Sequence, residues 1–182
     1  QRIVVAGKGA DNIGMQCGGW TISWQGEHGA ITTGTTILEA IRSTVEDANN
    51  VLYTENGENA SGDVAIVVVG EDPYAEMKGD RSNLELGEKD LTLINNIQSK
   101  GIPVVVLLLS GRPMLITDHL EQWDAFVAAW LPGTEGKGVS NVLFGDYKPT
   151  GRLPFSWPRS MNQLPVSKTD DHLFNLGYGL TY

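Results

Sequence analysis

Four carboxylates, a lysine and a tyrosine stand within ten residues in the segment Glu71–Asp80. This acidic segment directly follows the apolar run Val64–Gly70, which is typical of a fully buried strand. Carboxyl groups can donate or accept protons and can act as nucleophiles. Because ligands bind at the loops that follow the carboxyl ends of parallel strands, we expect one of these carboxylates to carry chemistry, with Glu76 as the first candidate.

Glu71 is the rival carboxylate in the same segment. It directly follows the predicted strand, so we expect it to orient backbone or to bind Lys78 or Arg112 rather than to react. A solvated acidic loop without any chemistry is the third interpretation, and the residue types alone leave it open.

A second candidate site is the segment Met15–Gly26, in which two adjacent glycines are followed by Trp20 and Trp24. We interpret it as a loop rather than a packed helix or strand, because Gly18-Gly19 lets the backbone turn sharply and approach other groups closely. Tryptophan has a large apolar face and one N–H donor, which suits stacking on a sugar ring. Both tryptophans are therefore candidate ligand-binding residues, and the alternative is that both belong to the core.

The composition excludes several classes of function. The 182 residues have a hydrophobic content of 41% and a net charge of −9, which predicts one globular domain without nucleic-acid or membrane partners. Cys17 is the only cysteine and the three histidines lie far apart, so we expect no metal site. No apolar run approaches the ~20 residues of a membrane span.

The turn Gly7–Asn12 begins like the Gly-x-Gly-x-x-Gly fingerprint of dinucleotide-binding proteins. Asn12 stands where the third glycine belongs, so we favour a structural turn and expect no cofactor. A nucleotide-binding, flavodoxin-like domain remains the weaker alternative.

Short apolar runs alternate with amphipathic segments along the chain, which predicts a doubly wound α/β domain with a mostly parallel sheet covered on both faces. A helix is expected to begin at Thr35 or Thr36, and the proline-rich segment 148–166 is expected to be irregular and on the surface. The expected strands are 3–6, 51–53, 64–69, 104–109 and 125–130, and the further helices are 84–100 and 134–144.

Several short motifs, in register from end to end, resemble the second domain of glycoside hydrolase family 3. Any one of them is weak, but their order and spacing together are specific. They are Gln16-Cys17-Gly18-Gly19-Trp20, Trp24-Gln25-Gly26, Gly70–Glu76 with Lys78-Gly79-Asp80, Ser110–Pro113, Trp130–Gly133 to Gly136, Gly151–Pro154 and Leu176–Leu180.

The resemblance is closest to the β-glucosidases and β-glucan exohydrolases, and it implies a three-layer α/β/α sandwich with a mostly parallel, six-stranded, flavodoxin-like sheet. Residues 1–182 correspond to that sandwich alone, as a fragment that lacks the preceding (β/α)8 barrel. The missing initiating Met agrees with a mature or excised segment. By the same resemblance, the natural protein is secreted or periplasmic.

The resemblance also implies the roles of the candidate residues. Glu76 matches the acid/base of a retaining, exo-acting enzyme that removes non-reducing-end β-D-glucosyl residues, and the nucleophilic aspartate belongs to the barrel. Trp24 matches one face of the aromatic clamp on the sugar next to the scissile bond, with Trp20 beside it. We therefore expect the isolated chain to be inactive. The alternative is a carbohydrate-binding module that uses the tryptophans without catalysis.

Overall fold

A computed structural model describes residues 1–167 and 171–182. In this part of the chain five strands form one parallel sheet in the order β2-β1-β3-β4-β5. The strands are β1 (Ile3–Ala6), β2 (Val51–Thr54), β3 (Val64–Gly70), β4 (Val104–Leu109) and β5 (Ala125–Trp130).

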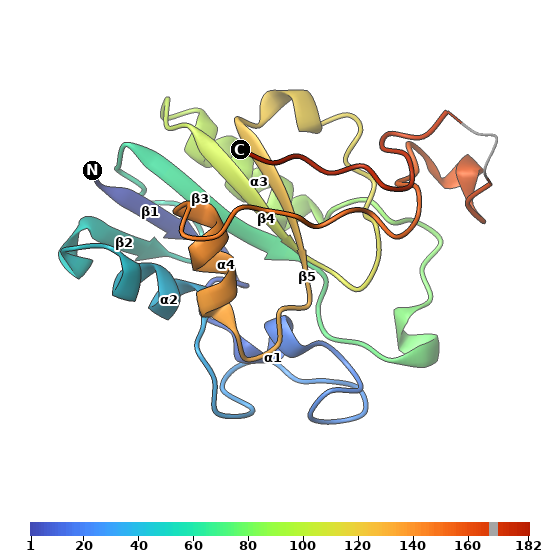
Figure 1. Cartoon of the computed structure of the whole chain (residues 1–182), viewed down its shortest axis with the longest axis horizontal. Helices are drawn as coiled ribbons and strands as arrows, with labels where there is room; N and C mark the ends of the chain where they lie inside the picture. The colour runs from blue at the N-terminus through green and yellow to red at the C-terminus, as the bar shows by residue number, and fades with distance from the viewer. Residues whose placement is uncertain (168–170) are drawn as a thin grey trace.

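Helices cover both faces of this sheet, which confirms the three-layer α/β/α sandwich (Figure 1). The α2 and α4 helices pack on one face, and α3 packs on the other. The helices are α1 (Ile13–Cys17), α2 (Ile37–Thr44), α3 (Glu88–Gln98) and α4 (Gly136–Leu143), with short 3-10 turns η1 (Ala48–Asn50), η2 (Glu76–Gly79), η3 (Leu120–Gln122) and η4 (Met161–Gln163). None of the helices in the described residues could cross a membrane.

Two hydrophobic cores form because neighbouring side chains along a strand point to opposite faces of the sheet. In β3, Val67 and Val69 pack toward α3, whereas Ile66 and Val68 pack toward α2. The central strands are apolar on both faces for this reason, as is usual for parallel sheets under helices.

The predicted start of α2 is confirmed at Thr36. Its hydroxyl accepts a hydrogen bond from the Glu39 N–H (3.1 Å), and the Glu39 carboxylate accepts one from the Thr36 N–H (2.8 Å). This capping box satisfies two backbone donors that a helix start otherwise leaves unpaired. The buried Gln16 amide extends the cap, because its oxygen accepts from the Ile37 N–H (3.0 Å) and its nitrogen donates to the Gly133 carbonyl (2.8 Å). Gln16 thereby ties α1 to α2 and to the loop after β5.

The structure corrects three expectations. The described residues form five strands, not six: the segment after α4 carries four prolines, which lack the N–H that a sheet requires, and its bridge between Trp157 and Phe174 lies within the segment and not to the sheet. The segment 15–26 is not all loop, because its first residues belong to α1. The α3 helix begins at Glu88 rather than near residue 84.

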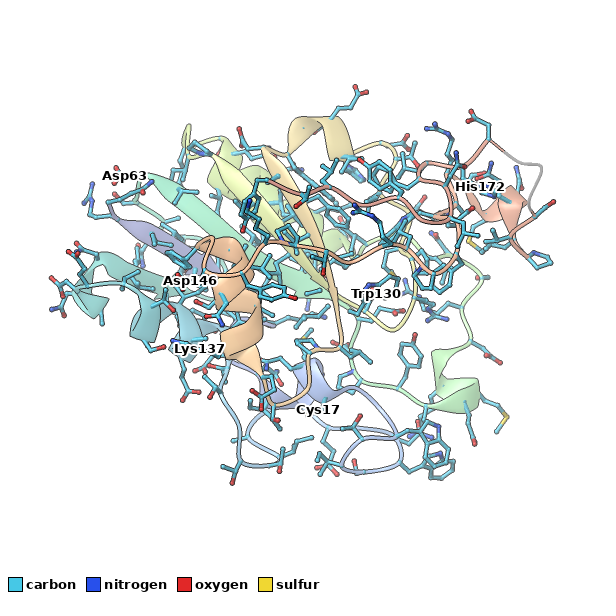
Figure 2. All side chains as sticks on the ribbon, in the orientation of Figure 1. Cys17, Asp63, Trp130, Lys137, Asp146 and His172 are labelled. Carbon is cyan, nitrogen blue, oxygen red and sulfur yellow. The ribbon has the colours of Figure 1, made fainter. Side chains whose placement is uncertain are left out.

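The segment 148–166 is irregular as predicted, but it does not lie wholly on the surface. The Trp157 side chain is buried on the α3 face of the sheet, and its indole N–H donates to the Met114 carbonyl (2.8 Å). Trp130, labelled in Figure 2 at the end of β5, packs against Trp157 with ring centroids 5.8 Å apart. Trp157 of this segment therefore packs against side chains of β5, an edge strand of the sheet.

The order of the strands sets the place where a ligand can bind. Chain connections leave β1 toward the α2 face and β3 toward the α3 face, so the switch point of the sheet lies between the carboxyl ends of these two strands. In open α/β sheets, that crevice is where ligands bind. The acidic segment follows β3 directly at this edge.

Asp90 in the first turn of α3 supports the end of β3. Its buried carboxylate accepts a hydrogen bond from the Gly70 N–H (3.2 Å), directly before Glu71. Burial raises the pKa of Asp90 above its ordinary value, although the Lys8 charge and the Gly70 N–H act in the opposite direction. A raised carboxyl pKa means that the folded state binds the proton more tightly than the unfolded state. The ionised form therefore costs stability once the pH rises through the folded-state pKa.

We predict that Asp90→Asn raises the melting temperature of the chain at about pH 7, and that this gain shrinks toward about pH 3, where the wild-type carboxyl is also neutral. Thermal unfolding across this pH range, followed by circular dichroism, measures the difference. Asp124→Asn is the matched control, because Asp124 accepts from the Val104 N–H (2.8 Å) but is exposed. A gain that is independent of pH would contradict the burial argument.

Candidate active site

Two loops lie side by side at the carboxyl edge of the sheet and form the candidate site (Figure 1). We call residues 18–26, after α1, the tryptophan loop and residues 71–85, after β3, the acidic loop. A Cβ atom built on Gly19 would lie 2.0 Å from the Tyr74 carbonyl oxygen, so only glycine allows the two backbones to approach this closely. The Gln25 side-chain oxygen also accepts from the Ala75 N–H (3.2 Å). The two candidate segments are therefore one site.

Glu76 is the exposed residue at the tip of the acidic loop, where η2 begins. Its φ of +49° is in the left-handed region, which a residue with a side chain seldom adopts and which costs on the order of 1–3 kcal/mol. Backbone strain of this kind persists only where the surrounding structure enforces it. The contacts on either side of Glu76 enforce it here, since Ala75 is bound by Gln25 and Gly79 is buried against Tyr74.

Trp20 and Trp24 are exposed, so the alternative that both belong to the core is wrong. Their side chains are 66% and 54% exposed, and the two rings lie 6.2 Å apart at 49° to one another. Trp20 also has a positive φ of +64°, and its N–H donates to the Trp24 carbonyl (3.0 Å). The loop thus presents two aromatic faces to solvent beside the acidic loop, where a flat ligand could stack.

Glu71 has the structural role that its position predicts. Its side chain is only 4% exposed, and its Oε1 atom accepts from both Nε (3.0 Å) and Nη2 (2.7 Å) of Arg112. The expected pairing with Arg112 is confirmed, whereas the second cation is Arg81 (3.4 Å) and not Lys78. The two guanidinium groups hold the Glu71 carboxylate inside the protein, whereas the Glu76 side chain is exposed to solvent.

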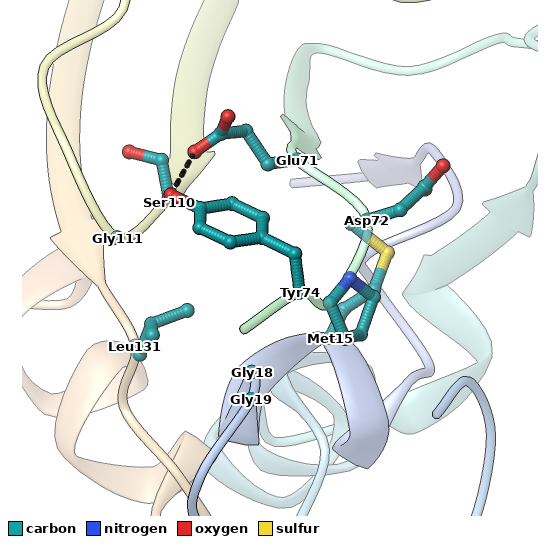
Figure 3. Close-up of a pocket in the computed structure, with 10 residues that line it drawn as sticks. Met15, Gly18, Gly19, Glu71, Asp72, Tyr74, Ser110, Gly111 and Leu131 are labelled. Carbon is teal, nitrogen blue, oxygen red and sulfur yellow. Dashed lines mark hydrogen bonds between the residues drawn. The ribbon is translucent and has the colours of Figure 1, made fainter. Parts of the chain in front are cut away.

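Tyr74 completes the cluster at the floor of the site. Figure 3 shows its hydroxyl directed at Glu71, where it donates to Oε2 (3.1 Å). Burial raises the pKa of Tyr74 to about 12, with the Glu71 charge as the second cause, so the hydroxyl keeps its proton. The Arg112 guanidinium lies over the ring, 4.7 Å from its centroid. A small hollow of about 130 Å³ beside the ring is lined by Tyr74, Glu71, Gly18, Gly19 and Leu131 among others.

An exposed ion pair joins the turn after β1 to the acidic loop. Lys8 Nζ lies 2.7 Å from the Asp72 carboxylate, and the His28 ring lies 3.4 Å from it. The hydrogen bond from Lys8 lowers the pKa of Asp72. Asn12 caps α1 through the Met15 N–H (3.0 Å). Lys8 and Asn12 of the Gly7–Asn12 turn thus serve local structure, which favours the structural interpretation of that turn over a nucleotide site.

Sequence reasoning missed three contributors to the site: Arg81, Gln25 and Tyr74. Tyr74 and Gln25 lie inside the two candidate motifs, which was the available signal. The local sequence does not show that residues of one loop contact residues of the other. Among the described residues, no group of three or more His, Cys, Asp or Glu side chains is placed to hold a metal ion.

Residues 1–182 match the Glycosyl hydrolase family 3 C-terminal domain, and the chain belongs to this family. Two similar proteins of known activity are the lysosomal beta glucosidase of Dictyostelium discoideum, at 32% identity over 100% of the chain, and the periplasmic beta-glucosidase of Salmonella typhimurium, at 30% identity over 90% of it. The chain spans about a quarter of the length of each, 26% in both cases.

Solved structures agree with the fold. The exo-1,3/1,4-beta-glucanase of a Pseudoalteromonas species matches 99% of the chain with a TM-score of 0.89 and 44% identity, and the match covers 24% of that protein. The beta-glucosidase of Listeria innocua matches the whole chain with a TM-score of 0.83 at 24% identity, and the match covers 30% of that protein. At this lower identity, the second likeness supports the fold alone.

We predict that Glu71→Gln destabilises the chain by about 1–3 kcal/mol, because it removes the buried charge that binds two partly exposed guanidinium groups. Asp72→Asn is the matched control at the next residue: its side chain is 67% exposed, and loss of its ion pairs should cost at most about 1 kcal/mol. Urea unfolding of both variants measures the difference. Equal losses in the free energy of unfolding would show that the Glu71 ion pairs stabilise the chain no more than exposed ion pairs do.

Proposed function

We propose that this chain supplies the general acid/base and part of the sugar-binding surface of a retaining, exo-acting β-glucosidase or β-glucan glucohydrolase. The enzyme would remove β-D-glucosyl residues from non-reducing ends. The observation that carries the proposal is the placement of Glu76, an exposed carboxylate in a strained backbone conformation, on a loop packed against the exposed Trp20 and Trp24. The names of the similar beta-glucosidases and of the exo-beta-glucanase support the substrate class.

In this mechanism Glu76 acts twice. It first protonates the glycosidic oxygen while a carboxylate on the opposite side of the sugar attacks the anomeric carbon. It then takes a proton from the water that hydrolyses the glycosyl-enzyme intermediate. Retention of configuration requires the two carboxyl groups to lie about 5–5.5 Å apart. An exposed position at the tip of a loop lets Glu76 reach across to such a partner.

The nucleophile in this proposal is an aspartate of a (β/α)8 barrel elsewhere in the full-length protein. The similar beta-glucosidases are about four times as long as the chain, which leaves room for such a domain. The exposed side chains of the two loops, Trp20, Ile22, Trp24 and Met77, form an apolar surface that would face the barrel and the sugar between them. The net charge of −9 argues against nucleic acid as a partner.

We also propose that the full-length protein acts outside the cytoplasm, as a secreted or periplasmic enzyme. The support is that one similar protein is named periplasmic and another lysosomal.

A carbohydrate-binding module without catalysis is the second candidate, because the exposed tryptophan pair alone would suffice for it. Such a module needs Trp20 and Trp24 but has no use for Glu76. Substitution of Glu76 therefore separates the two proposals.

We predict that Glu76→Gln in the full-length protein lowers kcat/KM for glucosides with poor leaving groups by about 10²–10⁴-fold, the usual contribution of a general acid. Aryl glucosides whose leaving group needs no protonation should lose about tenfold or less in their first step. Glu27→Gln, an exposed glutamate of the neighbouring segment, is the control and should retain activity. Steady-state kinetics across a series of aryl glucosides gives the dependence on the leaving group. Equal losses of kcat/KM across the series would contradict the acid/base assignment.

The isolated 182-residue chain is also expected to show no turnover of any of these glucosides.

We predict that Trp24→Ala lowers kcat/KM for a β-linked glucose disaccharide by about tenfold, because stacking on the second sugar contributes on the order of 1–1.5 kcal/mol. Methyl β-glucoside has no second ring, so its kcat/KM should change little. Trp24→Phe should keep most of the activity on the disaccharide, and Ile22→Ala tests a neighbouring exposed apolar residue that has no stacking face. An equal loss of kcat/KM for the disaccharide and for methyl β-glucoside would contradict a stacking role of Trp24.

A further inference from the structure

We propose that Tyr74 is the positioning residue that sets the place of Glu76, acting through its contact with Gly79. This inference rests on the proposed function of Glu76 as the acid/base. It assigns to the cluster of Glu71, Arg112 and Tyr74 a role in the reaction beyond the stability of the loop.

The Tyr74 ring is held in one orientation by groups from two different strand ends. Its hydroxyl donates to Glu71 after β3, and its face lies under the Arg112 guanidinium from the loop after β4. Arg112 is fixed in turn by its double contact with the same carboxylate, at 3.0 and 2.7 Å. A Cβ atom built on Gly111 would lie 3.2 Å from the hydroxyl oxygen, so the backbone also limits the ring on that side. The ring is thus attached to the sheet and not only to its own loop.

The Cδ2 and Cε2 side of the ring contacts the turn that contains Glu76. A Cβ atom built on Gly79 would lie 2.3 Å from Cδ2 and 2.5 Å from Cε2 of Tyr74, so the buried Gly79 rests directly on the ring. Gly79 is the last residue of η2 and Glu76 is its first. At the other end of the turn, the Ala75 N–H is bound by Gln25. The strained backbone at Glu76 is therefore fixed between two contacts, one to the tryptophan loop and one to Tyr74.

The Tyr74 hydroxyl is committed to Glu71 and does not serve the substrate. Its raised pKa of about 12 keeps the proton in place, and its hydrogen-bond partner is a buried carboxylate. A proton donor must lie within hydrogen-bond reach of the oxygen it protonates, and a misplacement of about 1 Å can cost about 10²-fold in rate. Displacement of η2 should therefore lower the rate of proton donation more strongly than it weakens sugar binding.

Gly79→Ala in the full-length protein tests this directly. The φ of Gly79 lies outside the left-handed region, so alanine fits the backbone, and the three nearest atoms that its Cβ would meet all belong to the Tyr74 ring. We expect kcat/KM for a glucoside with a poor leaving group to fall by about 10–100-fold and that for an activated aryl glucoside to fall by less than about threefold. Gly87→Ala is the matched control, because a Cβ atom there meets open space. If Gly79 had only a structural role, the variant would contain less folded protein, and the apparent kcat/KM would fall by the same factor for both substrates.

Two further variants keep the test decisive if Gly79→Ala folds poorly. Tyr74→Phe retains the ring but loses its bond to Glu71, and it should give a smaller loss, about threefold to tenfold, with the same dependence on the leaving group. In a Tyr74→Ala background the ring is absent, so adding Gly79→Ala should cause no further loss. Additive losses, or losses without any dependence on the leaving group, would overturn the positioning role.

Glu76→Gln, measured in parallel, separates this inference from the proposed function on which it rests. If Glu76→Gln lacks the leaving-group dependence, the acid/base assignment fails, whatever the Gly79 variant does. If Glu76→Gln shows the dependence and the Gly79 and Tyr74 variants do not, only the positioning role fails.

Discussion

The buried carboxylate of Glu71 is the constraint on which the candidate site depends. A buried charge is stable only when it is paired, and Glu71 is paired with Arg112 from the loop after the neighbouring strand and with Arg81 from the far end of its own loop. One carboxylate therefore joins the ends of β3 and β4 and closes the base of the acidic loop. Such a pair selects one arrangement of the loops more than it adds stability, because desolvation offsets much of the attraction.

The two glutamates of the acidic loop have different surroundings, although their side chains are identical. Glu71 is buried under guanidinium groups next to the strand end, whereas Glu76, further along the same loop, is exposed in a strained conformation. A parallel sheet with its switch point between β1 and β3 brings both loops to this edge. The cluster around Glu71 supports the loop, and Glu76 is left exposed on it.

In the proposed function, the chain presents only part of a catalytic site. Its aromatic pair and its exposed carboxylate face outward, and the similar beta-glucosidases extend over about four times its length. A retaining hydrolase needs two carboxyl groups on opposite sides of one bond. In our proposal a separate domain carries the second group, so that the sugar is bound between two rigid bodies and water is excluded from both sides.

The sequence by itself determined the family, the α/β class, the positions of the five strands, the start of α2 at Thr35 or Thr36, and the two loops of the candidate site. These features follow from periodicity, capping residues and short motifs, which depend on neighbours only a few residues apart. Only the tertiary structure decided which loops touch: Gly19 meets Tyr74, Gln25 binds Ala75, and Arg81 returns to Glu71. It also buried Trp157 and left the sheet with five strands in the described residues. Contacts between residues some 50 positions apart, such as Gln25 with Ala75, depend on strand order and on the path of each loop, and local sequence encodes neither.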